Sequence, residues 1–164
     1  IRFGSDSGKK ISACVNGSGN SVIKIPFLTG NISINGLGNV MLDHIATIEC
    51  KINGSGDVMC NKAGNPTIHI NGSGNFRANE VYGKLKSKIN GSGDIYLGSG
   101  HVDSFEARIN GSGDIDAKNI CTLLADLAIE GSGNITVGRV IEQSIEKHSK
   151  NSSIKILKRG KLLP

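Results

Sequence analysis

The stretch Ile52-Asn53-Gly54-Ser55-Gly56-Asp57-Val58 contains one copy of a five-residue motif that recurs along most of the chain. The motif occurs seven times, beginning at Asn16, Asn35, Asn53, Asn71, Asn90, Asn110 and Glu130. Its starts lie 18 to 20 residues apart, both glycines are present in every copy, and the fifth residue is always Asn or Asp. A period of this length indicates a repeat architecture in which each copy forms one structural unit.

The residues on either side of the motif alternate between apolar and polar side chains. If the first motif residue is position 0, positions −3 and −1 before it and +5 and +7 after it are mostly apolar. This alternation predicts two short strands per repeat, each with one buried face. A third apolar site follows in several repeats, at Ile45, Val81, Val102, Ile120 and Val140.

Every repeat has the same polarity and the same apolar positions, so stacked repeats place like residues on like. We therefore predict an all-β fold, a parallel β-helix (solenoid) of about seven rungs, each 18–20 residues long. The glycines of the motif permit a tight turn because they adopt positive φ without steric cost. Stacked Asn side chains can add hydrogen-bonded amide ladders.

The pattern divides the chain into three parts. Residues 1–10 are predicted to form an N-terminal edge or cap, residues 11–138 the solenoid repeats, and residues 139–164 a C-terminal cap with a basic tail. Within the last part, residues 140–148 fit either a short helix or an irregular rung, and residues 149–156 resemble a decayed eighth turn. A cap is expected because an open solenoid end exposes unpaired strand edges.

Composition and charge narrow the function classes. The 164-residue chain has no Trp and only six aromatic residues, so its core must consist of small aliphatic side chains. The net charge of +5 comes from residues 147–164, which hold six Lys or Arg and no acid, whereas residues 1–146 have a net charge of −1. A nucleic-acid-binding domain carries basic residues on its folded surface, so this role is not expected. No run of about 18 apolar residues is present, so no transmembrane segment is expected.

The in-phase array of Gly-Ser-Gly-Asn and Gly-Ser-Gly-Asp turns with aliphatic flanks resembles the head GIN domain of auto-transporter adhesins, over about residues 11–138. Leu37 in place of Ser and Glu130 in place of Asn depart from the pattern. The resemblance implies a right-handed parallel β-helix from a bacterial extracytoplasmic protein, in the periplasm or on the cell surface. It supplies no catalytic residue. The chain begins with Ile1, so we interpret it as a fragment or processed form that does not include a signal peptide.

The outward position −2 carries the candidate binding residues. On four successive rungs it forms a basic stripe of Lys51, His69, Lys88 and Arg108. Such a stripe can bind an acidic polysaccharide or surface phosphates. The alternative is a solvated face on which the neighbouring position −4, with acids such as Glu49 and Glu106, neutralises part of the charge in cross-strand pairs.

Two other sets of residues are candidate sites. Asp94 and Asp114 end adjacent motifs, and two carboxylates can bind Ca²⁺, but the four Asn at the same position fit a turn requirement better. We therefore expect no metal. Cys50 and Cys60 lie at inward positions of one rung, where they are either buried thiols or a disulfide. The glycine turns lack the GxxxxGK[ST] pattern of phosphate loops, and no cofactor is expected.

The sequence thus favours a non-catalytic bacterial interaction module, an adhesin, whose partner is a cell-surface or envelope polymer or a protein. One alternative is a structural spacer or a self-assembling envelope scaffold. A less favoured alternative is a polysaccharide-acting enzyme, which needs paired carboxylates in one groove, as Asp94 and Asp114 would provide.

Overall fold

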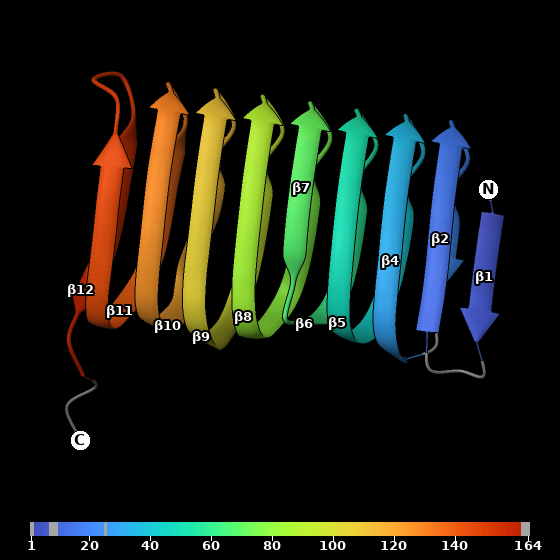
Figure 1. The fold of residues 1–164 in the computed structure, drawn as a ribbon, viewed down its shortest axis with the longest axis horizontal. Coiled ribbons are helices and arrows are strands. Elements are labelled where there is room, and N and C mark those ends of the chain that lie inside the picture. The colour runs from blue at the N-terminus through green and yellow to red at the C-terminus, as the bar shows by residue number, and fades with distance from the viewer. Residues whose placement is uncertain (1, 7–9, 25, 162–164) are drawn as a thin grey trace.

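The structure, a computed structural model, describes residues 2–6, 10–24 and 26–161. The described residues form twelve β-strands and no helix. The strands stack as the successive coils of a parallel β-solenoid of about eight turns, with the N- and C-termini at opposite ends (Figure 1). The predicted all-β parallel solenoid is confirmed, and the stack is one turn longer than the seven motifs indicate.

The strands are, in chain order, β1 (Arg2–Asp6), β2 (Lys10–Gly17), β3 (Ser21–Ile23), β4 (Phe27–Gly36), β5 (Val40–Gly54), β6 (Val58–Gly64), β7 (Thr67–Gly72), β8 (Phe76–Gly91), β9 (Ile95–Gly111), β10 (Ile115–Gly131), β11 (Asn134–His148) and β12 (Ser153–Arg159). The longer strands bend around the coil, so that one strand contributes to both of its sides.

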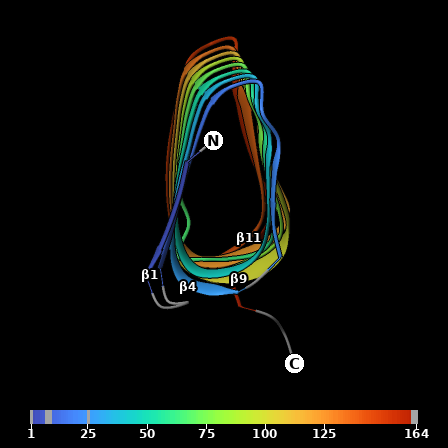
Figure 2. The ribbon, with the colours of Figure 1, turned by 90° about the vertical axis from the view of Figure 1, so that its right-hand side faces the viewer.

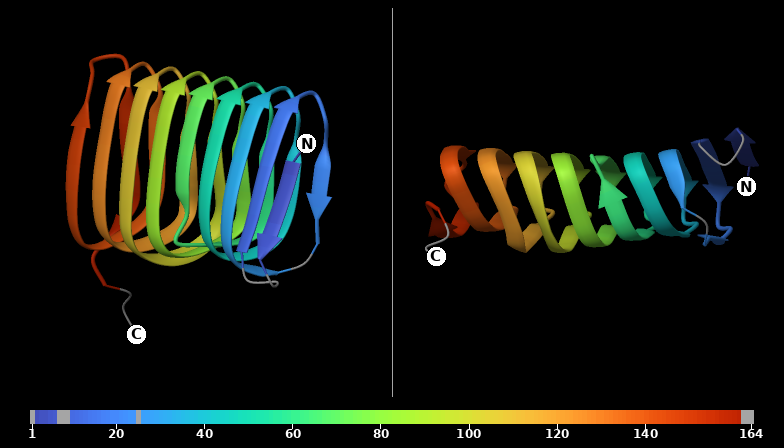
Figure 3. Two further views of the ribbon diagram at one scale, coloured as in Figure 1. Left: turned by 45° about the vertical axis from the view of Figure 1, so that its right-hand side comes forward. Right: turned by 90° about the horizontal axis from the view of Figure 1, so that it is seen from below.

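The coil is a flattened loop that is narrow at one end and wider at the other (Figure 2). In Figure 1 the chain rises along the front, crosses at the narrow end, descends behind and advances away from the N-terminus, which is a right-handed path. From below, successive coils follow one another along a nearly straight axis (Figure 3). The seven motif turns lie at the narrow end, because each motif begins where a front strand ends.

The register between coils places identical motif positions on top of one another. Asn53 pairs with Asn71, and Asn71 pairs with Asn90, in parallel ladders. The inward positions therefore form continuous columns along the solenoid axis. At position −1 these are Val15, Ile34, Ile52, Ile70, Ile89, Ile109 and Ile129, all buried. Burying one such side chain contributes about 1.5–3 kcal/mol, so regular stacking of small aliphatic residues replaces the large aromatic core of an ordinary globule.

The third apolar site is also buried, but it is not one column. Val81 and Ile120 both pair with Gly100, whereas Val102 pairs with Thr122, which in turn pairs with Val140. The third apolar site therefore consists of two columns along the solenoid axis. Between β8 and β9 the register shifts after Gly83, where the repeat lengthens from 19 to 20 residues and the additional residue is accommodated at the wide end of the coil.

The glycine turns are held together by contacts between backbones. The amides of Ser73 and Gly74 both donate to the carbonyl oxygen of Gly54 one coil earlier, at 2.9 and 3.0 Å. The same arrangement recurs in the neighbouring turns. The first glycine of each motif has positive φ, for example +133° at Gly72. The second has no room for a side chain, because a Cβ on Gly74 would collide with the Gly56 carbonyl oxygen and with Ile52.

Two ladders of Asn and Asp flank these glycines. At motif position 0, the Asn53 amide donates to Asn35 at 3.0 Å, and bonds of the same kind link residues 16 to 90. At the last motif position, each side-chain Oδ1 accepts the backbone N–H of its counterpart on the next coil. The Asn75 N–H to Asp57 Oδ1 bond of 2.9 Å is one example. An acceptor oxygen is therefore required here, which explains why only Asn and Asp occur.

The two ends of the stack differ from its middle. At the N-terminal end, β1 runs antiparallel to β2 and pairs along its outer edge. At the C-terminal end, residues 140–148 belong to strand β11, so the rung alternative and not the helix is observed, and β12 supplies the eighth turn.

The last coil carries polar residues where the preceding coil is apolar. Ser144 and Glu146 stand in register with Ala125 and Leu127. Arg159 donates to the Ser144 hydroxyl and to Glu146 Oε1, each at 2.6 Å. The hydrogen bond from Arg159 lowers the pKa of Glu146 below its ordinary value. An ion pair thus occupies the position that Leu127 fills one coil earlier.

Replacing Gly74 by Ala is expected to destabilise the fold by about 1–3 kcal/mol, because the added methyl group overpacks the turn against the Gly56 backbone. Urea unfolding followed by circular dichroism measures the change. Ser73→Ala, at the neighbouring exposed position, is the matched control and should stay within about 0.5 kcal/mol of the parent. Equal stability of the two variants would refute the close-contact account of the turn.

Replacing Glu146 by Gln should lower stability at pH 7 by up to about 1 kcal/mol, since the partner Arg159 is largely exposed. The lowered pKa means that the ion pair contributes fully above the ordinary glutamate pKa of 4.5 and is lost as the pH falls through the folded-state value. The parent and the variant should therefore converge below this pH in thermal unfolding. Glu142→Gln, an exposed neighbour on β11, should keep the parent's pH profile.

Candidate functional site

The front of the solenoid carries the basic stripe. The register stacks Lys51 on His69, His69 on Lys88 and Lys88 on Arg108, on strands β5, β7, β8 and β9. Their spacing is that of neighbouring parallel strands, about 4.8 Å. Lys51 and Lys88 are exposed, while His69 and Arg108 are partly buried.

Acidic neighbours pair with both ends of this stripe. Lys51 Nζ lies 2.8 Å from Glu49 Oε1, and the hydrogen bond between them lowers the pKa of Glu49. Arg108 donates to the Asp126 carboxylate at 2.6 Å and to the Asp126 carbonyl at 2.9 Å, and the carboxylate bond raises the pKa of Arg108. Much of the positive charge at the ends of the stripe is therefore neutralised.

The centre of the stripe differs from its ends. Within residues 10–24 and 26–161, no carboxylate lies within 4 Å of a nitrogen of His69 or Lys88. The nearby Lys86 lies 3.7 Å from Glu106, a longer separation than in the end pairs. The part of the stripe without an acidic neighbour within 4 Å, among the described residues, is thus Lys88 with His69.

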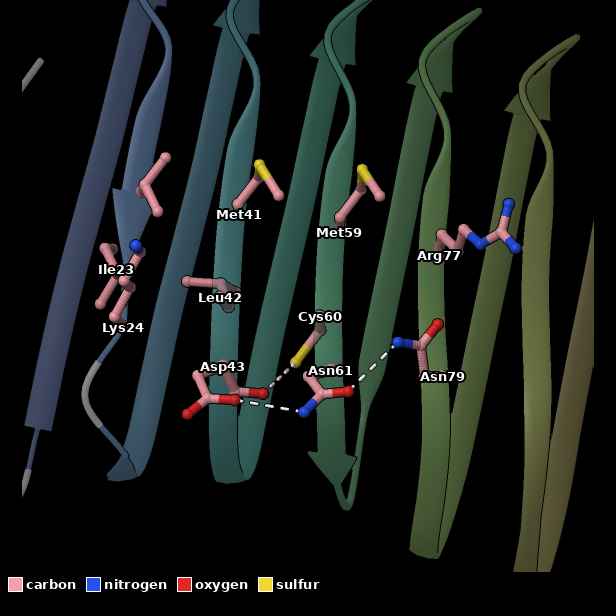
Figure 4. A pocket seen from close by; sticks show the side chains of 11 residues that line it. Ile23, Lys24, Met41, Leu42, Asp43, Met59, Cys60, Asn61, Arg77 and Asn79 are labelled. Atoms are coloured by element: carbon pink, nitrogen blue, oxygen red, sulfur yellow. Dashed lines mark hydrogen bonds between the residues drawn. The ribbon is translucent and has the colours of Figure 1, made fainter.

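The back of the solenoid contains a groove that the sequence analysis missed (Figure 4). It has a volume of about 490 Å³ and runs across strands β3, β5, β6 and β8. We call it the methionine groove and define it by its lining residues: Val22, Ile23, Lys24, Met41, Leu42, Asp43, Met59, Cys60, Asn61, Arg77 and Asn79.

One wall of the groove is an exposed apolar column. Val22, Met41 and Met59 occupy the same outward position on three successive coils, and their exposed fractions are 58, 47 and 45 %. Arg77 follows on the fourth coil. The sequence contained a signal for this wall, because three apolar residues in succession fill position +6, where the alternation predicts polar side chains.

The other wall of the groove is polar. Asn61 Nδ2 donates to Asp43 Oδ1 at 3.2 Å, and Asn79 Nδ2 donates to Asn61 Oδ1 at 3.1 Å (Figure 4). These three side chains form an amide ladder beside the apolar column. Leu42 and Cys60 are buried between the walls. The groove therefore combines apolar surface with a row of hydrogen-bonding groups.

The cysteines are free thiols in the structure. Cys50 and Cys60 are both buried, so the buried-thiol alternative is observed and the disulfide alternative is not. Burial raises the pKa of both thiols, that of Cys60 to about 12. The Cys60 thiol donates to the Lys62 carbonyl oxygen at 3.3 Å. Both groups are protonated at neutral pH and belong to the core.

The stacked carboxylates of Asp94 and Asp114 take part in the backbone ladder. Asp94 Oδ1 accepts the Asp114 N–H at 2.8 Å, and Asp114 Oδ1 accepts the Asn134 N–H at 2.7 Å and its side-chain amide at 2.9 Å. In the part of the chain that the structure describes, no group of three or more His, Cys, Asp or Glu side chains is arranged to hold a metal ion. The same part contains no helix long and apolar enough to cross a membrane.

We expect Asp114→Asn to be as stable as the parent, because the amide oxygen still accepts the Asn134 N–H. Asp114→Ala should lose about 1 kcal/mol, since both bonds from Asn134 lose their acceptor. Thermal unfolding of the three proteins with Ca²⁺ or with chelator checks this ladder role. A melting temperature that rises with Ca²⁺ in the parent but not in Asp114→Asn would assign the carboxylates to a metal instead.

Comparison with known proteins places the chain in a family. The family described as "Putative auto-transporter adhesin, head GIN domain" matches residues 39–157, which include both the central part of the stripe and most of the methionine groove. Comparison with curated proteins and with solved structures gave no match. The match extends over most of the chain and includes six of the seven glycine motifs, either whole or in part. The protein therefore belongs to the head GIN domain family of auto-transporter adhesins.

Proposed function

We propose that this domain is a non-catalytic interaction module of the bacterial cell surface or periplasm, which binds a cell-surface or envelope polymer or a protein. The observation that carries the proposal is the register of the outward columns. Each outward position presents one side chain per coil, and on four successive coils these side chains are Lys51, His69, Lys88 and Arg108. Such a rigid row fits an elongated partner that makes many equivalent contacts.

Membership in an adhesin family supports the same function. The charge distribution supports a contact at the centre of the front face, because Lys88 and His69 have no acidic partner within 4 Å among the described residues. A positively charged centre attracts acidic groups such as the uronates or phosphates of envelope polymers.

The test is retention of the isolated domain on an array of acidic and neutral glycans and matrix proteins. We expect the parent to be retained and Lys88→Glu to bind at least fivefold more weakly, because the substitution reverses the charge at the centre of the stripe. Lys155→Glu reverses an exposed charge on β12, away from this face, and is the matched control.

Each outcome of this test bears on the proposal. Loss of binding in Lys88→Glu alone supports recognition by the stripe. Equal binding by all three proteins assigns recognition to another face. Absence of retention on every surface would contradict the interaction module and favour the structural spacer.

A further inference from the structure

We propose that the methionine groove binds an extended peptide segment in which apolar side chains stand next to a carboxylate. This inference rests on the proposed interaction function and names one class of partner, a protein. It is carried by the two walls of the groove and by the charge at one of its ends.

The apolar wall has the dimensions of a short extended peptide. Val22, Met41 and Met59 with Arg77 span three coil spacings, about 14 Å, which is the length of about four residues in an extended strand. Exposed apolar surface gathered in one place marks an interaction site more often than scattered apolar residues do. Methionine is also adaptable, because its unbranched side chain repacks around different partners.

The amide wall favours a peptide over an aliphatic chain. Each Asn of the ladder uses one side-chain N–H in the bonds to Asp43 and Asn61 and keeps a second N–H. The side-chain oxygen Oδ1 of Asn79 accepts none of the hydrogen bonds found among the described residues, whereas its backbone carbonyl oxygen accepts one from Ser99. A peptide backbone carries both donors and acceptors, whereas an acyl chain would leave these groups without partners. The groove thus matches the two chemical characters of a peptide, apolar side chains and polar backbone.

Arg77 determines where the acidic group lies. Its guanidinium stacks on the Tyr96 ring, with Cζ 4.4 Å from the ring centroid. In the described part of the chain no carboxylate lies within 4 Å of its nitrogens. A guanidinium without a neighbouring carboxylate is complementary to the carboxylate of a ligand, which it can bind through two parallel hydrogen bonds. At the other end of the ladder Asp43 repels an acid while Lys24 attracts one, so these two charges offset each other, and Arg77 is the favoured site for the peptide carboxylate (Figure 4).

The chain offers an unusually direct spectroscopic test. It contains two methionines, and both line the groove. A phage library of random nonapeptides is first selected against the parent protein, and the enriched peptides are synthesised. Each is then added to protein with ¹³C-labelled methionine methyl groups. We expect enriched sequences that combine apolar residues with Asp or Glu, and we expect shifts of both methyl resonances.

Variants on one outward column separate the groove from the rest of the surface. Met59→Asp and Arg77→Glu should weaken peptide binding at least tenfold. Thr136→Asp and Lys155→Glu introduce the same charges on the same column outside the groove, and their binding should stay within twofold of the parent. Arg77→Glu should in addition select peptides with Lys or Arg in place of the acid. Circular dichroism verifies that each variant is folded. The methyl shifts are measured on the parent protein, so this readout is informative even if a variant fails to fold.

Three results would overturn the assignment: no enriched peptides, peptides that leave both methyl resonances unchanged, or equal binding to Met59→Asp and to the parent. Retention of the domain on glycans without any peptide selection would uphold the proposed interaction function and refute the peptide groove. The two proposals can therefore fail separately.

Discussion

The close contact between glycine backbones in successive turns is the constraint on which the rest of the solenoid depends. The two amides that follow Gly72 reach the Gly54 carbonyl oxygen because no side chain stands between the turns. A Cβ at the second glycine would collide with the backbone of the coil before it. This contact brings the coils to strand spacing at the narrow end and so sets the register of the ladders on both sides.

A fixed register has consequences for the core and for the surface. Inside, it places Ile on Ile in long columns, which allows a chain without Trp to bury its apolar surface in a regular way. Outside, it stacks the side chains of each outward position one above another, one per coil. Amide ladders and charged rows therefore form from the strands and turns of the coil alone. Function on such a surface is a matter of which residue occupies which column.

The two outward faces illustrate two uses of this rule. On the front, acids in the neighbouring column pair with Lys51 and Arg108, so that charge is concentrated near Lys88. On the back, three apolar residues replace the polar residues of one column and create a groove that ends at Arg77. We propose acidic polymers as partners of the first arrangement and a peptide as the partner of the second. The last coil uses the same rule in another way, since Glu146 and Arg159 place charge where other coils place apolar residues.

The sequence by itself determined the repeat, the parallel stacking and the inward columns, because these depend on local alternation and on glycine turns that recur with the period of the coil. It also located the stripe residues on successive coils. Only the tertiary structure decided which charges remain without acidic partners, since the Arg108–Asp126 pair joins residues 18 positions apart and depends on side-chain geometry. The split of the third apolar site was likewise decided in three dimensions, where the wide end of the coil absorbs a changing repeat length. The groove emerged for the same reason: exposure and depth are properties of neighbouring coils together, and the pattern of any single repeat does not contain them.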